Sequence, residues 1–226
     1  MMFKHFSFRT FLKPILITIP FIVTILINSC GIRNETITWK IDSVEEIEGL
    51  PVVVSGSPRV LTSEEGKMVE FNGKTDGLLV SSNPVAAWEN FVIEVDIKPY
   101  AGFPENKEQR FLHIQDPGNE NRRILIELRL NENNQWYGDW FIKTENESIT
   151  LVDSTQTHPL NLWATISLKY RDGVLTGLIN GKEQAQGAIK YLSAGPSAQT
   201  SIGTRMDRRS WFKGAIKEIR FISLDK

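Results

Sequence analysis

The chain has 226 residues, of which 41% are hydrophobic, and this supports one domain of ordinary size around a single core. It contains 26 Lys and Arg against 27 Asp and Glu, so the formal net charge is −1. Without a basic excess, nucleic acid is not an expected partner. The only cysteine in the chain has no second cysteine to form a disulfide with.

The first 29 residues have the pattern of an export signal. Lys4, Arg9 and Lys13 precede an apolar run over 14–27, which is short for a membrane span and is soon followed by polar residues. The run leads into Ile-Asn-Ser directly before Cys30. This ending resembles the lipobox of bacterial lipoproteins, in which the cysteine carries the lipid. An uncleaved anchor, or an ordinary signal with a chance cysteine, is the alternative.

The lipobox resemblance implies a lipid-anchored protein of the bacterial cell envelope, at the outer membrane, facing the periplasm or the cell surface. Residues 1–29 would be the signal peptide, 30–38 the lipidated N-terminus and a tether, and 39–226 the folded domain. Removal of the signal leaves 23 basic and 27 acidic residues, so the mature protein is also not basic. The membrane partner would be reached through the lipid on Cys30.

From Trp39 onward, short apolar segments alternate with turn residues and no helical period persists. The clearest strand is 91–98, in which four apolar residues share one face while Glu94, Asp96 and Lys98 share the other. Asn180-Gly181 predicts a tight hairpin, because both central residues of a type I′ turn need positive φ. Further strands are expected at 47–54, 68–71, 78–80, 111–114, 124–130, 136–144, 149–152, 163–170, 174–179, 187–189 and 201–203.

The segment 211–222 predicts a closing strand, since apolar residues alternate with charged ones after Gly214. Such a strand is expected to pair with the first strand of the domain and to seal the fold. About eleven to thirteen strands joined by short turns favour an all-β, two-sheet antiparallel sandwich over βαβ units.

Several of these segments together resemble the laminin G-like jelly rolls of the concanavalin A-like lectin and glucanase superfamily. The resemblance covers about 39–224 and rests on the order of five segments, 71–80, 91–98, 163–170, 175–182 and 212–220. It implies a jelly roll of curved antiparallel strands with a concave face. It implies no single activity, because that fold carries lectins, adhesion modules, glycosidases and lyases.

Some relatives with this fold hold a structural calcium near the opening turn and the closing strand. Here the closing strand has Lys217 where family members often have an aspartate. An ammonium group repels Ca²⁺, so the sequence disfavours a calcium and we expect no cofactor. One hypothesis is that Lys217 pairs with Asp76 in place of the metal, and the alternative is that Lys217 points into solvent.

The aromatic strand and an arginine-rich loop provide the candidate binding site. Residues 136–142 carry large rings at both parities, so at least one ring must lie outside the core. Sugars stack on exposed rings, while carboxylates and guanidinium groups bond their hydroxyls. Gly138 would allow the close approach of a ligand or a neighbouring strand. The alternative is that these rings only fill a wide sandwich.

The loop 205–211 holds three arginines and a tryptophan. Arginine binds carboxylates and sulfates at two points, so the expected ligand is a polysaccharide and the loop favours an acidic one. Arg110, His113, Arg122 and Arg123 would add to this positive surface if their loops folded to the same rim, and solvated charges paired with Asp207 and nearby acids are the alternative. The candidate ligand-binding residues are Tyr137, Asp139, Glu127, Arg129, Arg205, Trp211 and His113.

We predict no catalytic residue and no metal site. Glu94 and Asp96 resemble the catalytic strand of glycoside hydrolase family 16, but Lys98 stands where the second glutamate is needed. Tyr137, His113 and Arg129 supply only the residue types of a lyase, and the histidine spacing does not favour zinc. The predicted function is carbohydrate binding without catalysis. A glycosidase or lyase acting on an acidic glycan, and a protein adhesion module, are the alternatives.

Overall fold

The computed structural model describes residues 1–2 and 35–225 of the chain. The expected signal, Cys30 and most of the expected tether therefore lie outside the described residues. The chain divides into two units, 1–32 and 33–226, and all described strands belong to the second. No helix in the described part has the length and apolar character that a membrane span requires.

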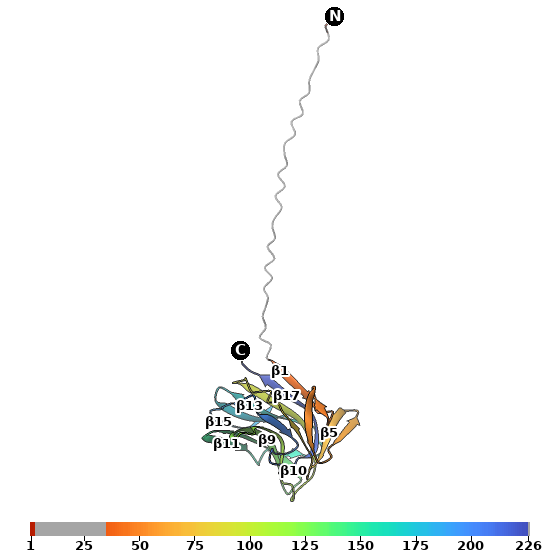
Figure 1. Ribbon diagram of the computed structural model, residues 1–226, viewed down its shortest axis with the longest axis vertical. Helices are drawn as coiled ribbons and strands as arrows, with labels where there is room; N and C mark the ends of the chain where they lie inside the picture. Colours follow the sequence, from red (N-terminus) through yellow and green to blue (C-terminus); the bar gives the residue numbers. More distant parts are fainter. Residues whose placement is uncertain (3–34, 226) are drawn as a thin grey trace. The chain divides into compact units, whose positions relative to one another are not determined.

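The domain is built from two antiparallel sheets (Figure 1), which confirms the predicted sandwich. The eight-stranded sheet has the order β15 (Lys182–Ala188), β14 (Val174–Ile179), β13 (Ala164–Arg171), β7 (Phe91–Pro99), β17 (Lys213–Ser223), β5 (Gly66–Asn72) and β4 (Arg59–Ser63), with β1 (Thr36–Lys40) also paired to β17. The nine-stranded sheet has the order β11 (Glu147–Val152), β10 (Gln135–Thr144), β9 (Asn119–Leu130), β8 (Glu108–Asp116), β16 (Gln199–Ile202), β6 (Gly77–Val80), β3 (Leu50–Ser55) and β2 (Glu46–Ile47), with β12 (His158–Pro159) paired to β10.

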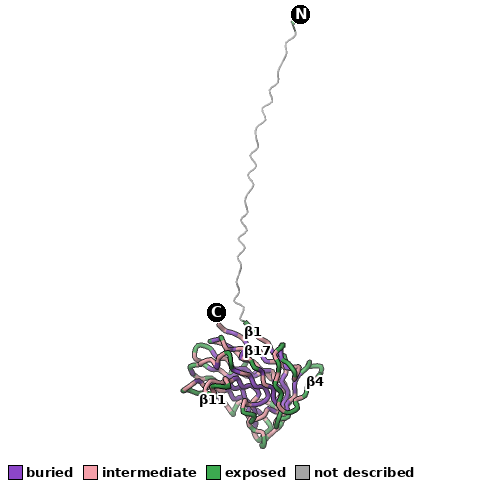
Figure 2. The backbone as a smooth tube through the Cα atoms, viewed as in Figure 1, coloured by how far each residue is buried: buried purple, intermediate pink, exposed green. Residues whose placement is uncertain are grey.

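The facing sides of the two sheets form one hydrophobic core, seen as the buried centre of Figure 2. Buried and half-buried residues alternate along all of β7, as predicted. Trp140 of β10 is fully buried, and its ring needs both Gly138 and Gly177, where an added Cβ would come within 2.3 Å of the indole. Gly138 therefore makes room for the Trp140 ring in the core. The expectation that it allows the close approach of a ligand is wrong.

The closing strand β17 lies inside the eight-stranded sheet and pairs with β1, as predicted. Trp39 of β1 packs edge-on against Phe221, with ring centroids 5.0 Å apart. Because β1 begins at Thr36, three residues expected in the tether belong to the sheet. Asn180 and Gly181 both have positive φ, as the predicted hairpin requires. The short strands β2, β4 and β12 were not predicted.

The predicted pair between Asp76 and Lys217 is wrong. The buried Asp76 carboxylate accepts the backbone N–H of Ser57 at 2.9 Å and that of Asn72 at 3.0 Å. Lys217 instead lies over the Trp163 ring, 5.0 Å from its centroid. No group of three potential metal-ligating side chains occurs among the described residues. The expectation that the protein binds no calcium stays a prediction.

Asp76→Asn tests whether the Asp76 carboxylate stabilises the fold only by accepting these backbone hydrogen bonds, without a bound metal. We expect the free energy of unfolding to fall by about 1.5 kcal/mol, because an amide can accept only one of the two N–H groups. Urea unfolding in calcium and in chelator should give the same loss. Asp172→Asn, at a side chain that is 78% exposed, is the matched control. If calcium stabilised the wild type and not the variant, Asp76 would be a metal ligand.

Candidate functional site

Outward-facing residues of four adjacent strands, β8 to β11, line a hollow of about 180 Å³ on the outer face of the nine-stranded sheet. One residue of the loop between β16 and β17 completes its rim. We call it the arginine hollow, and its lining is Arg110, Arg123, Leu125, Glu127, Arg129, Asp139, Phe141, Thr150 and Arg205.

Strand register explains why these residues meet. Across the sheet, Asp139 of β10 lies opposite Glu127 of β9, which lies opposite Arg110 of β8. Directly opposite side chains on neighbouring strands have Cβ atoms about 4.5–5.5 Å apart. Alternation along the predicted strand 124–130 places Glu127 and Arg129 on the outer face, while Ile126 and Leu128 lie in the core.

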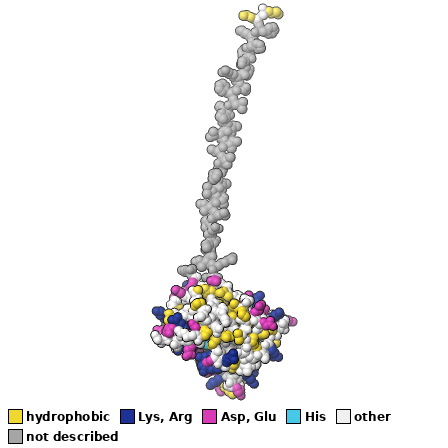
Figure 3. Space-filling model, in the orientation of Figure 1, with side chains coloured by type: hydrophobic (Ala, Val, Ile, Leu, Met, Phe, Trp, Pro, Cys, Tyr) yellow, Lys and Arg dark blue, Asp and Glu magenta, His cyan; other side chains and the backbone are white. Residues whose placement is uncertain are grey.

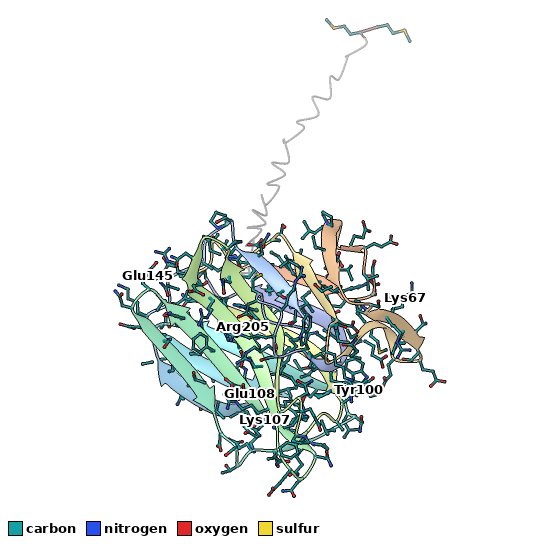
Figure 4. All side chains as sticks on the ribbon, turned by 60° about the horizontal axis from the view of Figure 1, so that its bottom comes forward. Lys67, Tyr100, Lys107, Glu108, Glu145 and Arg205 are labelled. Atoms are coloured by element: carbon teal, nitrogen blue, oxygen red, sulfur yellow. The ribbon has the colours of Figure 1, made fainter. Side chains whose placement is uncertain are left out.

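Each of the two buried carboxylates has its own arginine. Arg110 Nε donates to Glu127 Oε1 at 2.5 Å, and Arg129 Nε donates to Asp139 Oδ2 at 2.8 Å. Glu108 of β8, outside the lining, lies 3.8 Å from Arg110 and 3.6 Å from Arg129. Figure 4 shows Arg205 and Glu108 over the same sheet. The acids and arginines therefore form one connected ionic lattice.

Burial makes both carboxyls hard to ionise. It raises the pKa of Glu127 to about 7 despite the attraction of Arg110, and the charge of Asp139 adds to the increase. Burial also raises the pKa of Asp139, against the hydrogen bond from Arg129. Within the described part, Asp139 Oδ1 is buried without a hydrogen-bond partner. Near neutral pH, Glu127 is present in both its protonated and its ionised form.

The hollow has more positive than negative charge. Arg123 forms no ion pair with any described residue; it donates to the Glu120 carbonyl at 2.7 Å and lies over the Phe141 ring at 5.3 Å. Burial lowers the pKa of Arg123 and of Arg205, and the nearby charge of Arg209 lowers both further. Each group stays charged, so the field here favours an anion. Figure 3 shows basic side chains gathered over part of one face of the domain.

Four of the seven predicted site residues meet in the arginine hollow: Glu127, Arg129, Asp139 and Arg205. Tyr137 is half-buried beside Arg129, its register partner, just beyond the lining. Trp211 lines a neighbouring hollow, described below.

His113 is fully buried beneath the arginine loop. Its Nδ1 accepts the N–H of Met206 at 2.9 Å, and burial lowers its pKa to about 3. His113 therefore supports the loop and is not available to a ligand, contrary to expectation. Tyr137 lies opposite Arg129 of β9, and His113 lies opposite Leu125 of the same strand. These positions are four residues apart, which separates Tyr137 from His113 by about 13 Å along the strand direction. The residues of a lyase site are therefore not brought together.

Some residues of the hollow were missed by sequence reasoning, namely Leu125, Phe141 and Thr150. Phe141 lies two residues after Asp139 in the same strand and so points to the same face, which could have predicted its place in the hollow. Arg122, considered for this surface, bonds Glu145 at 2.6 Å outside the lining. On the outer face of the other sheet, Arg220 binds Glu94 at 2.9 Å and Asp96 at 3.0 Å, so the strand that resembles a glycosidase is held in a structural ion cluster.

The domain matches a known protein family. The family model described as the concanavalin A-like lectin/glucanases superfamily, of laminin G type, matches residues 70–224. The chain belongs to this superfamily. The match includes every strand that lines the hollow. A comparison with curated protein sequences gave no match.

Solved structures share the fold of this superfamily member at low sequence identity. Domain 4 of AbnA, an extracellular GH43 arabinanase from Geobacillus stearothermophilus in complex with arabinotriose, aligns at 15% identity and TM-score 0.62, covering 84% of this chain and 93% of that one. The binding domain of botulinum neurotoxin DC in complex with SialylT aligns at 15% identity and TM-score 0.60, covering 84% and 48%. A SAP-like pentraxin from Limulus polyphemus aligns at 11% identity and TM-score 0.54, covering 66% and 72%.

Proposed function

We propose that the protein binds an acidic polysaccharide through the arginine hollow and does not cleave it. The observation that carries the proposal is that four arginines line one hollow around two buried carboxyls, and that only Arg110 and Arg129 are bound to these carboxyls. Similar structures solved with arabinotriose and with SialylT agree with a carbohydrate ligand on this fold. At 15% identity they support only the fold, so the ligand class rests on the chemistry of the hollow.

The hollow suits one acidic sugar unit. Its volume of about 180 Å³ is below the roughly 300–1,000 Å³ of pockets for drug-sized ligands. Arg123 and Arg205 provide planar donor groups for a carboxylate or a sulfate. Glu127 and Asp139 hold Arg110 and Arg129 in place at the base of the hollow, and Phe141 offers an apolar ring edge. A domain that is acidic overall thus concentrates its cations where the ligand would bind.

A glycosidase is the second candidate, because Glu127 and Asp139 are buried carboxyls on neighbouring strands. A retaining enzyme needs one ionised carboxylate and one proton donor about 5 Å apart. Acid and base roles arise where environments push two pKa values in opposite directions. Here burial raises both, and an arginine occupies each carboxyl. The geometry therefore favours binding over hydrolysis.

The lipid anchor belongs to the same proposal and rests on the sequence around Cys30 alone. A lipid on Cys30 would hold the domain at the bacterial outer membrane, on its periplasmic or its surface face. Labelled fatty acid should enter the wild-type protein in bacterial cells and should not enter a Cys30→Ser variant. Label in the variant, or none in the wild type, would contradict lipidation.

The test of function is a binding and depolymerisation screen of the purified full-length protein. Galacturonate oligomers carry a carboxylate, sulfated galactan oligomers carry a sulfate, and arabinan and cellulose oligomers are neutral controls. We expect binding to at least one acidic series, weakening with salt, and no new reducing or unsaturated ends. Such ends would show an enzyme. Binding only to neutral glycans, or only to envelope proteins, would contradict the proposal.

A further inference from the structure

A second hollow, of about 490 Å³, adjoins the arginine hollow. Its lining is Gly73, Lys74, Pro104, Glu105, Asn106, Lys107, Glu108, Ser210 and Trp211, and we call it the Trp211 hollow. The two hollows share a wall. Arg110, which lines the first, donates to the hydroxyl of Ser210 and lies 3.8 Å from Glu108, both of which line the second.

Trp211 is held in place by its backbone. Asn106 Nδ2 donates to its carbonyl at 2.9 Å, Arg110 N–H donates to the Ser210 carbonyl at 2.8 Å, and Lys213 N–H donates to Gln109 at 2.9 Å. The chain is thus fixed just before and just after the indole, which is only partly buried. A partly exposed ring on a rigid backbone binds at little entropic cost.

The Trp211 hollow is lined by two lysines and by two acids, Glu105 and Glu108, so its formal charges balance, and Glu108 is already engaged by Arg110 and Arg129. The two lysines, Lys74 and Lys107, form no ion pair with any described residue. In Figure 4, Lys107, Glu108 and Arg205 follow one another across this face. Cations therefore flank the wall on both sides, and the Trp211 ring offers a surface for the apolar C–H face of a sugar.

We propose that the Trp211 hollow binds the sugar units next to the acidic unit held in the arginine hollow, so that the protein recognises several consecutive units of an acidic chain and not an isolated sugar. This inference rests on the proposed function. The shared wall of Arg110, Ser210 and Glu108 would lie beneath the linkage between the two units.

Calorimetric titration of the full-length protein with galacturonate oligomers, and with chondroitin sulfate oligomers as the sulfated series, tests the inference. Affinity should rise about tenfold from the shortest to the longer oligomers. Trp211→Ala should remove that increase and leave the affinity for the shortest oligomer unchanged, whereas Trp211→Phe should keep most of it. Trp163→Ala, at a tryptophan directly before β13 of the other sheet, is the matched control.

The outcomes separate this inference from the proposed function. Affinity independent of chain length would overturn the Trp211 hollow and leave the arginine hollow in place. Equal losses for short and long oligomers in Trp211→Ala would show that Trp211 acts only through the fold of the loop, which also overturns the inference. Failure of every acidic oligomer to bind the wild type would overturn both proposals.

Discussion

Arg110→Met is expected to lower the free energy of unfolding by about 3 kcal/mol at about pH 8.5 and by about 1 kcal/mol at about pH 5.5. The Arg110 side chain is 15% exposed and the Glu127 side chain 7%, so water cannot replace the lost partner. At the higher pH, the variant retains a buried carboxylate whose arginine has been removed. At the lower pH the Glu127 carboxyl is protonated, so the loss of Arg110 leaves no buried charge at Glu127 without a partner.

The pH dependence follows from the pKa of Glu127, which rises from 4.5 to about 7 on folding. Since the folded protein binds this proton more tightly than the unfolded chain, the contribution of Glu127 to stability falls as pH rises from about 4.5 to about 7 and is then constant. In the variant the pKa is raised further. Its stability should therefore continue to fall above pH 7, where that of the wild type no longer does.

Urea unfolding of both proteins at the two pH values measures the effect. Arg171→Met, at an arginine that is 57% exposed, is the control and should change little at either pH. Adding Glu127→Leu to Arg110→Met should restore most of the loss at the higher pH, because both members of the pair are then apolar. Losses that are equal at both pH values would mean that Arg110 stabilises the fold by packing alone.

The sequence was sufficient to predict most of the strands, because alternation of apolar and charged residues reports burial on one face. In the predicted strand 124–130, the even-numbered apolar residues lie in the core, whereas Glu127 and Arg129 line the arginine hollow. Glu127 of β9 and Asp139 of β10 point to the same outer face, and the pairing of the two strands places them directly opposite each other.

Local irregularities set the limit of the prediction. The register between β8 and β9 shifts between Arg110 and Leu112, so Arg110 and His113 both lie opposite outward residues although three positions separate them. Simple alternation places them on opposite faces. The burial of His113 likewise depends on how the arginine loop folds back over β8, through a contact from Met206 that joins residues far apart in the sequence.

Arg205→Glu is expected to weaken the binding of acidic oligomers by about 100-fold or more, because a donor group is replaced by a carboxylate that repels the ligand. Arg208→Glu changes the net charge by the same amount in the same loop, but Arg208 does not line the arginine hollow. It should weaken binding by only a few-fold, and salt should abolish that smaller effect. Calorimetry at low and at high salt distinguishes the two variants.

The difference between these two arginines decides whether the ligand is held by contact or by the general field of the loop. Arg205 is 16% exposed and contacts Asp207 at 3.5 Å, so its guanidinium is already oriented at the rim. A ligand bound in the arginine hollow would therefore lose a directed interaction in one variant and only long-range attraction in the other. Equal losses in both variants, removed equally by salt, would mean that acidic glycans attach to the loop non-specifically and that the hollow is not the binding site.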